Sequence, residues 1–108
     1  MNDTLGEFEQ LVLFAVLRLG DDAYGRAIRR ELMDRAGRDA SAGAVFTTLE
    51  RLELRGLVDS DYGDPTPERG GRRKRFYRLR PEGKRALARS FDALSRMARG
   101  LKPKLETS

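Results

Sequence analysis

The sequence feature that most constrains the fold is the irregular segment 63–71, which holds three glycines and two prolines in nine positions. Such a composition excludes a helix or a strand there and predicts a loop. The flanking runs 57–62 and 72–80 contain aliphatic and aromatic side chains that suit extended structure. In the second run these side chains alternate between two faces, as they do in a strand. We therefore expect a β-hairpin with a long tip.

Positive charge is concentrated on the second arm of this hairpin and just after it. From Arg69 to Arg85 there are nine Lys or Arg residues and one acid, Glu82, so nine minus one gives this stretch a net charge of +8. The whole chain carries a net charge of +5, which solubility alone would explain equally well. The residues outside this stretch are therefore slightly acidic in total. A solvated surface usually mixes both signs. The segregation predicts a polyanionic partner, such as nucleic acid or an acidic membrane surface.

An amphipathic helix is expected over residues 42–55, directly before the hairpin. Ser41 is the expected N-cap, because its hydroxyl can accept a hydrogen bond from a backbone N–H of the first turn. One arc of this helix is apolar, and a second arc carries small, hydroxyl and guanidinium side chains, namely Ala44, Thr47, Thr48, Arg51 and Arg55. Thr can contact bases or phosphates, and Arg can bind guanine through two hydrogen bonds. The second arc is therefore a candidate DNA-reading face, although a solvated outer face is the ordinary explanation.

Two further helices are expected before this one. Residues 5–19 are apolar around most of the circumference, with side chains that include Phe8, Leu11, Val12 and Ala15. A helix that is apolar on most sides must be buried on most sides. Either a second chain covers it, or it is the central core helix of a monomer. Residues 23–35 form an ordinary amphipathic surface helix.

A long last helix is predicted over residues 82–101, with Pro81 in its first turn. Its apolar residues follow a heptad spacing and are Leu87, Phe91, Leu94, Ala98 and Leu101. At 1.5 Å per residue such a helix is roughly 30 Å long. Its apolar seam and the first helix would bury each other best across a two-fold axis. The residues from Lys102 onward are expected to form a frayed tail.

Several classes of function are disfavoured by composition. The chain has no Cys and no His, so it lacks thiolate ligands, disulfides and the commonest general base. We expect no enzyme, no metal and no cofactor. The longest apolar run, 11–17, is far shorter than the roughly 20 residues that span a bilayer, and the N-terminus does not resemble a signal peptide. A single cytoplasmic domain without membrane association is expected.

Seven local sequences in this order resemble the PadR family of bacterial transcriptional regulators, in its short form. The resemblance covers residues 5–101, and its pieces are 13–19, 24–25, 43–46, 49–52, 56–58, 75–79 and 81–83. It implies a mainly α fold with a small antiparallel β-hairpin (α+β), that is, a winged helix-turn-helix. Residues 1–80 would form the DNA-binding region and residues 81–108 the dimerisation helix and tail, within one compact domain.

The resemblance also implies a homodimeric repressor that binds an inverted repeat in double-stranded DNA through the third helix and the wing. Carried over by position, the DNA-binding residues are Tyr24, Ser41, Thr47, Thr48, Arg51, Arg72, Arg73 and Lys74. The last helix would pack on the partner's first helix, and a small-molecule effector bound near that interface would release the DNA. The residues of this interface or effector site are Phe8, Leu11, Val12, Ala15, Leu87, Phe91, Leu94, Ala98 and Leu101.

Three departures from the family pattern qualify these expectations. Phe46 stands where the family often has Tyr, and we expect this side chain in the core. Arg80 stands where Thr or Ser often caps the last helix, so that side-chain cap should be missing. The chain has no Trp, which excludes an effector site built on a stacking tryptophan. Two alternatives to specific DNA binding stay open: a winged-helix adapter for protein partners, and a protein that binds nucleic acid without reading its sequence.

Overall fold

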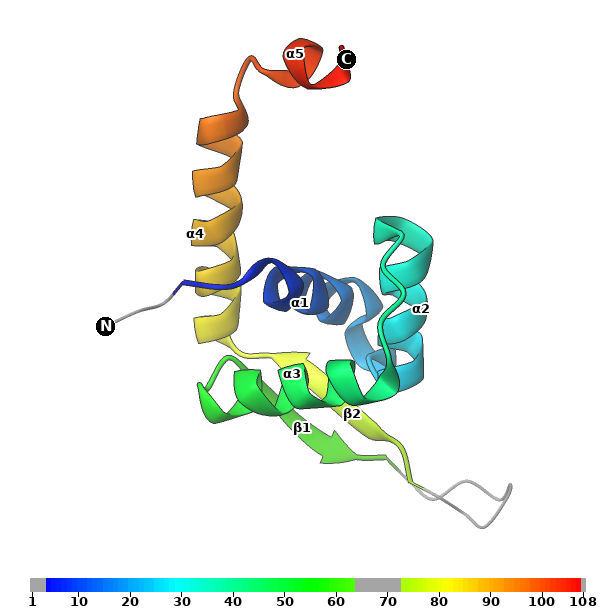
Figure 1. Ribbon diagram of the computed structural model, residues 1–108. Helices are drawn as coiled ribbons and strands as arrows, with labels where there is room; N and C mark the ends of the chain where they lie inside the picture. The colour runs from blue at the N-terminus through cyan, green and yellow to red at the C-terminus, as the bar shows by residue number, and fades with distance from the viewer. Residues whose placement is uncertain (1–3, 64–72, 108) are drawn as a thin grey trace.

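The computed structural model describes residues 4–63 and 73–107 of the chain. Three helices, a two-stranded hairpin and a long fourth helix follow one another, as the sequence predicts (Figure 1). The elements are α1 Glu7–Leu19, the 3-10 turn η1 Gly20–Asp22, α2 Gly25–Ala36, α3 Ala42–Leu54, β1 Val58–Tyr62, β2 Arg75–Leu79, α4 Pro81–Ala98 and α5 Lys102–Glu106. This arrangement confirms a mainly α fold with one antiparallel hairpin.

Helix α1 is the central element of the core. It packs against α2, α3, α4 and β2, and its residues Val12, Leu13 and Val16 are at most 2% exposed. Neighbouring elements of the same chain therefore bury most of its apolar circumference. Of the two explanations for this apolar circumference, the structure agrees with the second for these sides, because α1 is a core helix within one chain. The remaining apolar surface of α1 consists of half-buried Phe8, Leu11, Phe14 and Leu19 and exposed Leu17.

The hairpin joins the helical part through the segment between α1 and α2. Strands β1 and β2 pair in antiparallel register from Val58 opposite Leu79 to Tyr62 opposite Arg75. An isolated bridge links Tyr24 to Phe76 on the other side of β2, and the N–H of Tyr77 donates to the carbonyl of Ala23 at 2.8 Å. The start of α2 is thus held directly beside the hairpin.

Helix α3 has well-defined ends. The Ser41 hydroxyl accepts a hydrogen bond from the N–H of Ala44 at 3.0 Å, which confirms the predicted N-cap. After Leu54 the chain reverses at Gly56, whose φ of 76° lies in the left-handed region that favours glycine. The helix therefore leads directly into β1, and the hairpin starts at a fixed position beside it.

Helix α4 is packed only along its first half. Pro81 occupies its first turn and Arg80 gives it no side-chain cap, as predicted. Ala86 and Leu87 are buried, whereas every residue from Phe91 to the end of the helix is exposed. Figure 1 shows the second half rising away from the other helices. Beyond it the chain turns into α5 rather than the expected frayed tail, and Lys102 pairs with Glu106 within this short helix at 4.0 Å.

Neither a membrane-spanning helix nor a metal cluster is present in the part of the chain that the structure describes. No helix there is long and apolar enough to cross a bilayer. No three metal-ligating side chains converge among the same residues.

Candidate nucleic-acid interface

The outer face of α3 differs from the face expected from its sequence. Its most outward residues are Gly43, Thr47, Glu50 and Leu54, all exposed, and the Leu54 side chain is 90% exposed. Helix α3 and the hairpin lie together at one end of the molecule, opposite the projecting α4 (Figure 1). Along this face follow the bare backbone of Gly43, the hydroxyl of Thr47, the carboxylate of Glu50 and the aliphatic side chain of Leu54. Glu50 and Leu54 were not predicted as part of it.

Thr48 does not belong to this outer face. It is only 5% exposed and is a buried polar residue of α3. The prediction that it contacts DNA is corrected, because each step along a helix turns by about 100° and therefore leaves Thr48 beside the buried arc of Val45 and Leu49. Thr47 is exposed and keeps its hydroxyl accessible.

Arg51 and Arg55 are turned toward the start of α1. Their guanidinium groups approach the Glu9 carboxylate at 3.8 Å and 3.4 Å, respectively. Glu9 also accepts a hydrogen bond from the N–H of Gly6 at 2.8 Å, so its carboxylate is held in place. The Arg51 side chain stays 55% exposed, and at 3.8 Å its ion pair is loose. Arg51 therefore lies at the edge of the outer face, where it can reach a partner.

Two cations at the start of the second hairpin arm are exposed. Arg73 donates from Nε to the carbonyl of Gly63 at 3.0 Å, and its Cζ lies 5.9 Å from the centre of the Tyr62 ring. Lys74 places Nζ 4.3 Å from the centre of the Tyr24 ring, a cation–π distance. These contacts hold Arg73 beside the end of β1 and Lys74 beside the start of α2. Arg72, also predicted to bind DNA, lies outside the described residues.

Other cations of the +8 stretch are paired with acids. Arg75 binds Glu53 at 3.0 Å, and Arg78 binds Asp59 and Asp61 of β1 at 3.3 Å and 3.2 Å. The net charge of +8 counted for residues 69–85 did not include these acids, because they lie earlier in the sequence. The count therefore could not reveal that they neutralise Arg75 and Arg78. Among the described residues of the hairpin arm, Arg73 and Lys74 therefore keep positive charge for a partner, and Lys84 and Arg85 are exposed on α4.

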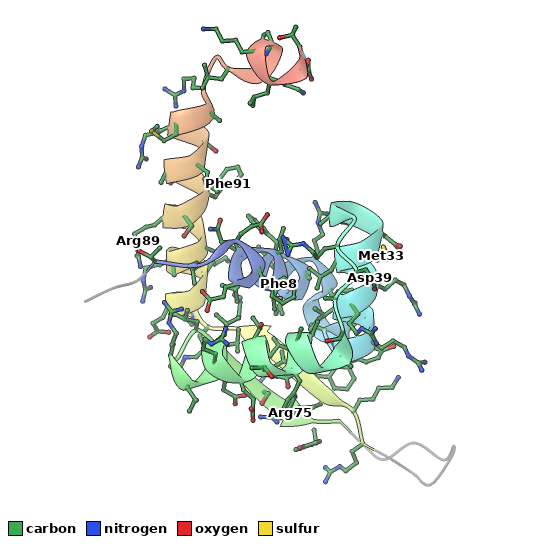
Figure 2. The ribbon with its side chains drawn as sticks, in the orientation of Figure 1. Phe8, Met33, Asp39, Arg75, Arg89 and Phe91 are labelled. Atoms are coloured by element: carbon green, nitrogen blue, oxygen red, sulfur yellow. The ribbon has the colours of Figure 1, made fainter. Side chains whose placement is uncertain are left out.

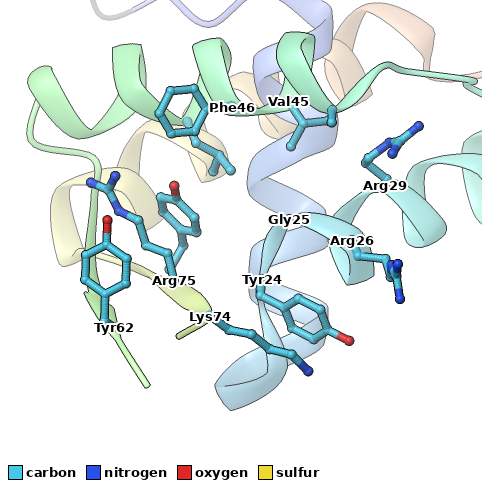
Figure 3. Close-up of a pocket in the computed structure, with 12 residues that line it drawn as sticks. Tyr24, Gly25, Arg26, Arg29, Val45, Phe46, Tyr62, Lys74 and Arg75 are labelled. Carbon is cyan, nitrogen blue, oxygen red and sulfur yellow. The ribbon is translucent and has the colours of Figure 1, made fainter. Parts of the chain in front are cut away.

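A hollow opens between the starts of α2 and α3 and the hairpin (Figure 3). Its volume is about 440 Å³, and its lining consists of Tyr24, Gly25, Arg26, Arg29, Ala42, Val45, Phe46, Leu49, Tyr62, Lys74, Arg75 and Tyr77. Phe46 is 45% exposed at its edge, so the assignment of this residue to the core was wrong. Phe46 flanks the apolar arc of α3, so its side chain could face either the core or this hollow. The position of the hairpin decides between the two.

The Tyr77 phenol at the inner side of the hollow is shielded from water. The residue is 3% exposed, and burial raises the pKa of the Tyr77 hydroxyl above its ordinary value, an effect that the nearby Arg75 cation partly offsets. The hydroxyl is therefore neutral at physiological pH. Tyr77 contributes a neutral aromatic ring to the hollow, while Tyr24 and Tyr62 contribute rings closer to the surface.

Comparison with known proteins places this geometry in a family. Residues 13–89 match the model of the family described as "Transcriptional regulator PadR-like family". The chain belongs to this family. The transcriptional regulator Rv3488 of Mycobacterium tuberculosis is 35% identical over 79 residues, which are 73% of this chain and 69% of that protein. The chain is thus a transcriptional regulator of the PadR-like family, as its local sequences indicated.

Solved structures of PadR-family proteins share the fold. A PadR family transcription regulator of Clostridium difficile R20291 superposes with a TM-score of 0.74 at 23% identity, covering 93% of this chain and 99% of that one. A PadR family regulator of Eggerthella lenta gives a TM-score of 0.67 at 28% identity, covering 94% of this chain and 88% of that one. The winged helix-turn-helix and the long helix that follows it are therefore common to these proteins.

The expected PadR-type interface on α1 and the first half of α4 is mostly interior in this chain. Val12, Ala15 and Leu87 are at most 4% exposed, so they belong to the core and not to a surface that a partner could touch. Phe8 and Leu11 are half-buried. The guanidinium of Arg38 lies 5.5 Å from the Phe8 ring centre and covers part of it.

The remaining predicted interface residues lie on the unpacked half of α4 and, for Leu101, just beyond its end. Phe91 extends from α4 above α1 (Figure 2), with its ring centre 6.2 Å from that of Phe14. Phe91, Leu94 and Leu101 are 54%, 59% and 41% exposed, and Ala98 is also exposed. These four residues, unlike the buried three, are available to a second chain.

Proposed function

We propose that the protein is a sequence-specific DNA-binding repressor that acts as a homodimer on an inverted repeat. The observation that carries this proposal is the location of the exposed α3 face and the cations Arg73 and Lys74 at one end of the molecule. Helix α3 would enter the major groove, and the start of the hairpin would contact the adjacent phosphate backbone. Membership of a family of transcriptional regulators supports a role in controlling transcription.

Different residues would serve affinity and specificity. Thr47 and Arg51 are the proposed base-reading residues, since Thr47 lies on the outer face of α3 and Arg51 at its edge. Ser41, Tyr24, Arg73 and Lys74 are proposed to contact phosphates, where they fix the position of the protein without reading sequence. Arg51 would exchange its loose pairing with Glu9 for a hydrogen bond to DNA.

The homodimer is proposed to form through the second half of α4. Phe91, Leu94 and Ala98 are exposed there in the single chain, as is Leu101 just after the helix, and exposed apolar surface of this kind marks an interaction site. In this proposal residues 1–80 provide one DNA-binding unit and residues 81–108 join two of them. Two units related by a two-fold axis would bind the two half-sites of an inverted repeat.

Binding sites selected from a library of random duplexes would test the function, because the natural operator need not be known. Fluorescence anisotropy would then compare a selected duplex with a scrambled duplex at several salt concentrations. We expect the selected site to show two inverted half-sites and binding to weaken steeply with salt, because cations on the protein displace counterions from DNA. A library that yields no enriched motif would contradict sequence reading.

Three variants would separate the proposed roles of the residues. Thr47→Ala should lower the preference for the selected duplex, whereas Lys74→Ala should weaken both duplexes about equally and reduce the salt slope by about 1. Lys104→Ala removes the same type of charge from α5, at the far end of α4 (Figure 1), and should leave DNA binding unchanged. An equal loss in Lys74→Ala and Lys104→Ala would mean that only net charge matters.

A further inference from the structure

An acidic side chain lies in the middle of the α3 face that is proposed to meet DNA. Glu50 is exposed, and it follows exposed Thr47 by three positions and precedes exposed Leu54 by four. Residues at these spacings lie on one side of a helix. The Leu54 side chain is 90% exposed, so this side of α3 is open to solvent. Glu50 would therefore come close to any molecule that this side of α3 approaches.

The two acids of α3 have different surroundings. Glu53 binds Arg75 at 3.0 Å and accepts a hydrogen bond from the Ser60 hydroxyl, also at 3.0 Å. Glu50, in contrast, makes no hydrogen bond or ion pair with any other residue in the described part of the chain. Its carboxylate is therefore available to a partner outside the chain. Since no contact within the chain is lost, its substitution should leave the fold intact.

A carboxylate at this place opposes DNA binding in general. Phosphates carry the negative charge of DNA along both strands, and like charges repel. The neighbouring Arg51 does not neutralise Glu50, because its guanidinium is turned toward Glu9 at 3.8 Å. The repulsion would be offset only where a hydrogen-bond donor of the DNA faces the carboxylate. In the major groove such donors are the amino groups of cytosine and adenine.

Small residues at the start of α3 permit the depth that a base contact needs. Ala42, Gly43 and Ala44 are exposed and carry at most a methyl group, so this end of the helix can lie deep in a major groove, as recognition helices do. Glu50 lies seven positions after Gly43, about two helical turns further along the same side. From there its side chain can reach the edge of a base and not only the backbone.

Cytosine suits a carboxylate better than adenine does. Adenine presents the acceptor N7 beside its N6 amino group, and this acceptor would repel a carboxylate, whereas cytosine presents its N4 amino group without an adjacent acceptor of its own. Guanine and thymine present acceptors in the major groove, together with the methyl group of thymine. A carboxylate on the outer face of α3 therefore favours cytosine over the other three bases.

We propose that Glu50 accepts a hydrogen bond from the N4 amino group of a cytosine and thereby selects a C·G pair at one position of each half-site. The inference rests on the proposed function and adds a specificity-determining residue to Thr47 and Arg51. It has a second consequence for unrelated DNA. Where another base faces Glu50, repulsion by the phosphates is not offset, so the carboxylate lowers affinity for sequences other than the operator.

Selection from a random duplex library with two variants tests the choice of base. A Gln side chain can bond to both N6 and N7 of adenine, so with Glu50→Gln one position of each half-site should change from cytosine to adenine. With Glu50→Ala the same position should lose its preference. In the wild-type protein, exchange of this base pair should weaken binding about tenfold. Identical motifs from the wild-type protein and both variants would overturn the inference.

Anisotropy with a scrambled duplex tests the second consequence. Glu50→Gln should bind this duplex about fivefold more tightly, because repulsion by nearby phosphates is removed. Glu106→Gln is the matched control, since it removes the same charge from exposed α5 at the far end of α4 (Figure 1), and it should leave binding unchanged. Equal tightening by both variants would assign the effect to net charge and overturn the position of Glu50 against DNA.

Failure of this inference can be distinguished from failure of the proposed function. If the wild-type protein binds no DNA or selects no motif, the proposed function fails and the role of Glu50 fails with it. If it selects a motif that both Glu50 variants retain, sequence reading stands and only the role of Glu50 fails. Thermal unfolding of the variants should match that of the wild-type protein, so that a changed motif reports on DNA contact and not on a changed fold.

Discussion

Gly83 lies in the first turn of α4, where the helix crosses the backbone that leads into β1. A Cβ atom at this position would lie 2.1 Å from the carbonyl oxygen of Leu57. The opposing atom belongs to the backbone, so it cannot rotate away as a side chain would. The same Leu57 carbonyl accepts a hydrogen bond from the N–H of Arg80 at 2.9 Å. The absence of a side chain at Gly83 therefore sets how closely α4 approaches the hairpin.

Gly83→Ala should destabilise the protein although alanine favours helices. Helix propensity alone would stabilise by about 1 kcal/mol, but the overlap with Leu57 should cost more and give a net loss of about 2 kcal/mol. Gly43→Ala is the matched control, because a Cβ there has its nearest neighbour at 4.0 Å and should stabilise α3 slightly. Urea unfolding of both variants measures the difference. Equal stabilisation by the two substitutions would contradict the close packing of α4.

At the scale of elements, α3 and the hairpin are joined by a three-residue polar network. Arg75 of β2 donates to Glu53 at 3.0 Å and to the Ser60 hydroxyl at 2.9 Å. Ser60 of β1 in turn donates to the Glu53 carboxylate at 3.0 Å. Both strands are thus linked to the last turn of α3. A network with several partners holds a fixed geometry better than a single surface ion pair.

Glu53→Gln should loosen the hairpin relative to α3. Because Glu53 and Arg75 are each about 30% exposed, solvent screening limits the expected loss of stability to about 1 kcal/mol. Glu31→Gln breaks the isolated helical pair with Arg35 and should cost only about 0.3–0.5 kcal/mol. Thermal unfolding would compare the two, and hydrogen exchange of the β1–β2 amides should rise only in Glu53→Gln. Unchanged exchange would mean that strand pairing alone fixes the hairpin.

The whole molecule has two dissimilar ends. At one end α3, the hairpin base and the start of α2 form a surface with exposed cations, and at the other α4 rises away with apolar residues exposed (Figure 1). The molecule measures 53 × 34 × 21 Å, and α4 accounts for much of the elongation. Such a shape buries little of the second half of α4 in a single chain. The proposed homodimer would bury it.

Leu94→Glu should separate the proposed homodimer into monomers. A carboxylate at the centre of the apolar seam would have to lose its hydration on dimerisation, at a cost of several kcal/mol. Arg96→Glu introduces the same side chain two positions later, on the other side of the helix because two positions turn by about 200°. Sedimentation velocity should show monomers for Leu94→Glu and dimers for the control. Dimers in both cases would place the contact between chains elsewhere.

The sequence by itself determined which elements form and in what order. The signals used were local: the apolar spacing along each helix, the Ser41 cap, Pro81 and the irregular segment 63–71. Local signals can be recognised without knowing which elements pack together in the folded chain. The motifs also indicated the PadR family correctly. Each predicted helix lay within a few residues of its observed bounds, although the sequence suggested no separate α5.

Tertiary structure decided which face of each element is available. Thr48 and Phe46 exchanged their predicted environments, because the burial of a residue beside an apolar arc depends on which elements cover that side of the helix. Val12, Ala15 and Leu87 were predicted at an interface but lie in the core for the same reason. An apolar core and an apolar interface contain the same kinds of residue, so the sequence cannot separate them. The pairing of Arg75 and Arg78 with acids, and the hollow beside Tyr24, also required segments distant in sequence to meet. Sequence periodicity shows that one side of a helix is apolar or charged, but only the packing of the folded chain determines which element or partner lies against that side.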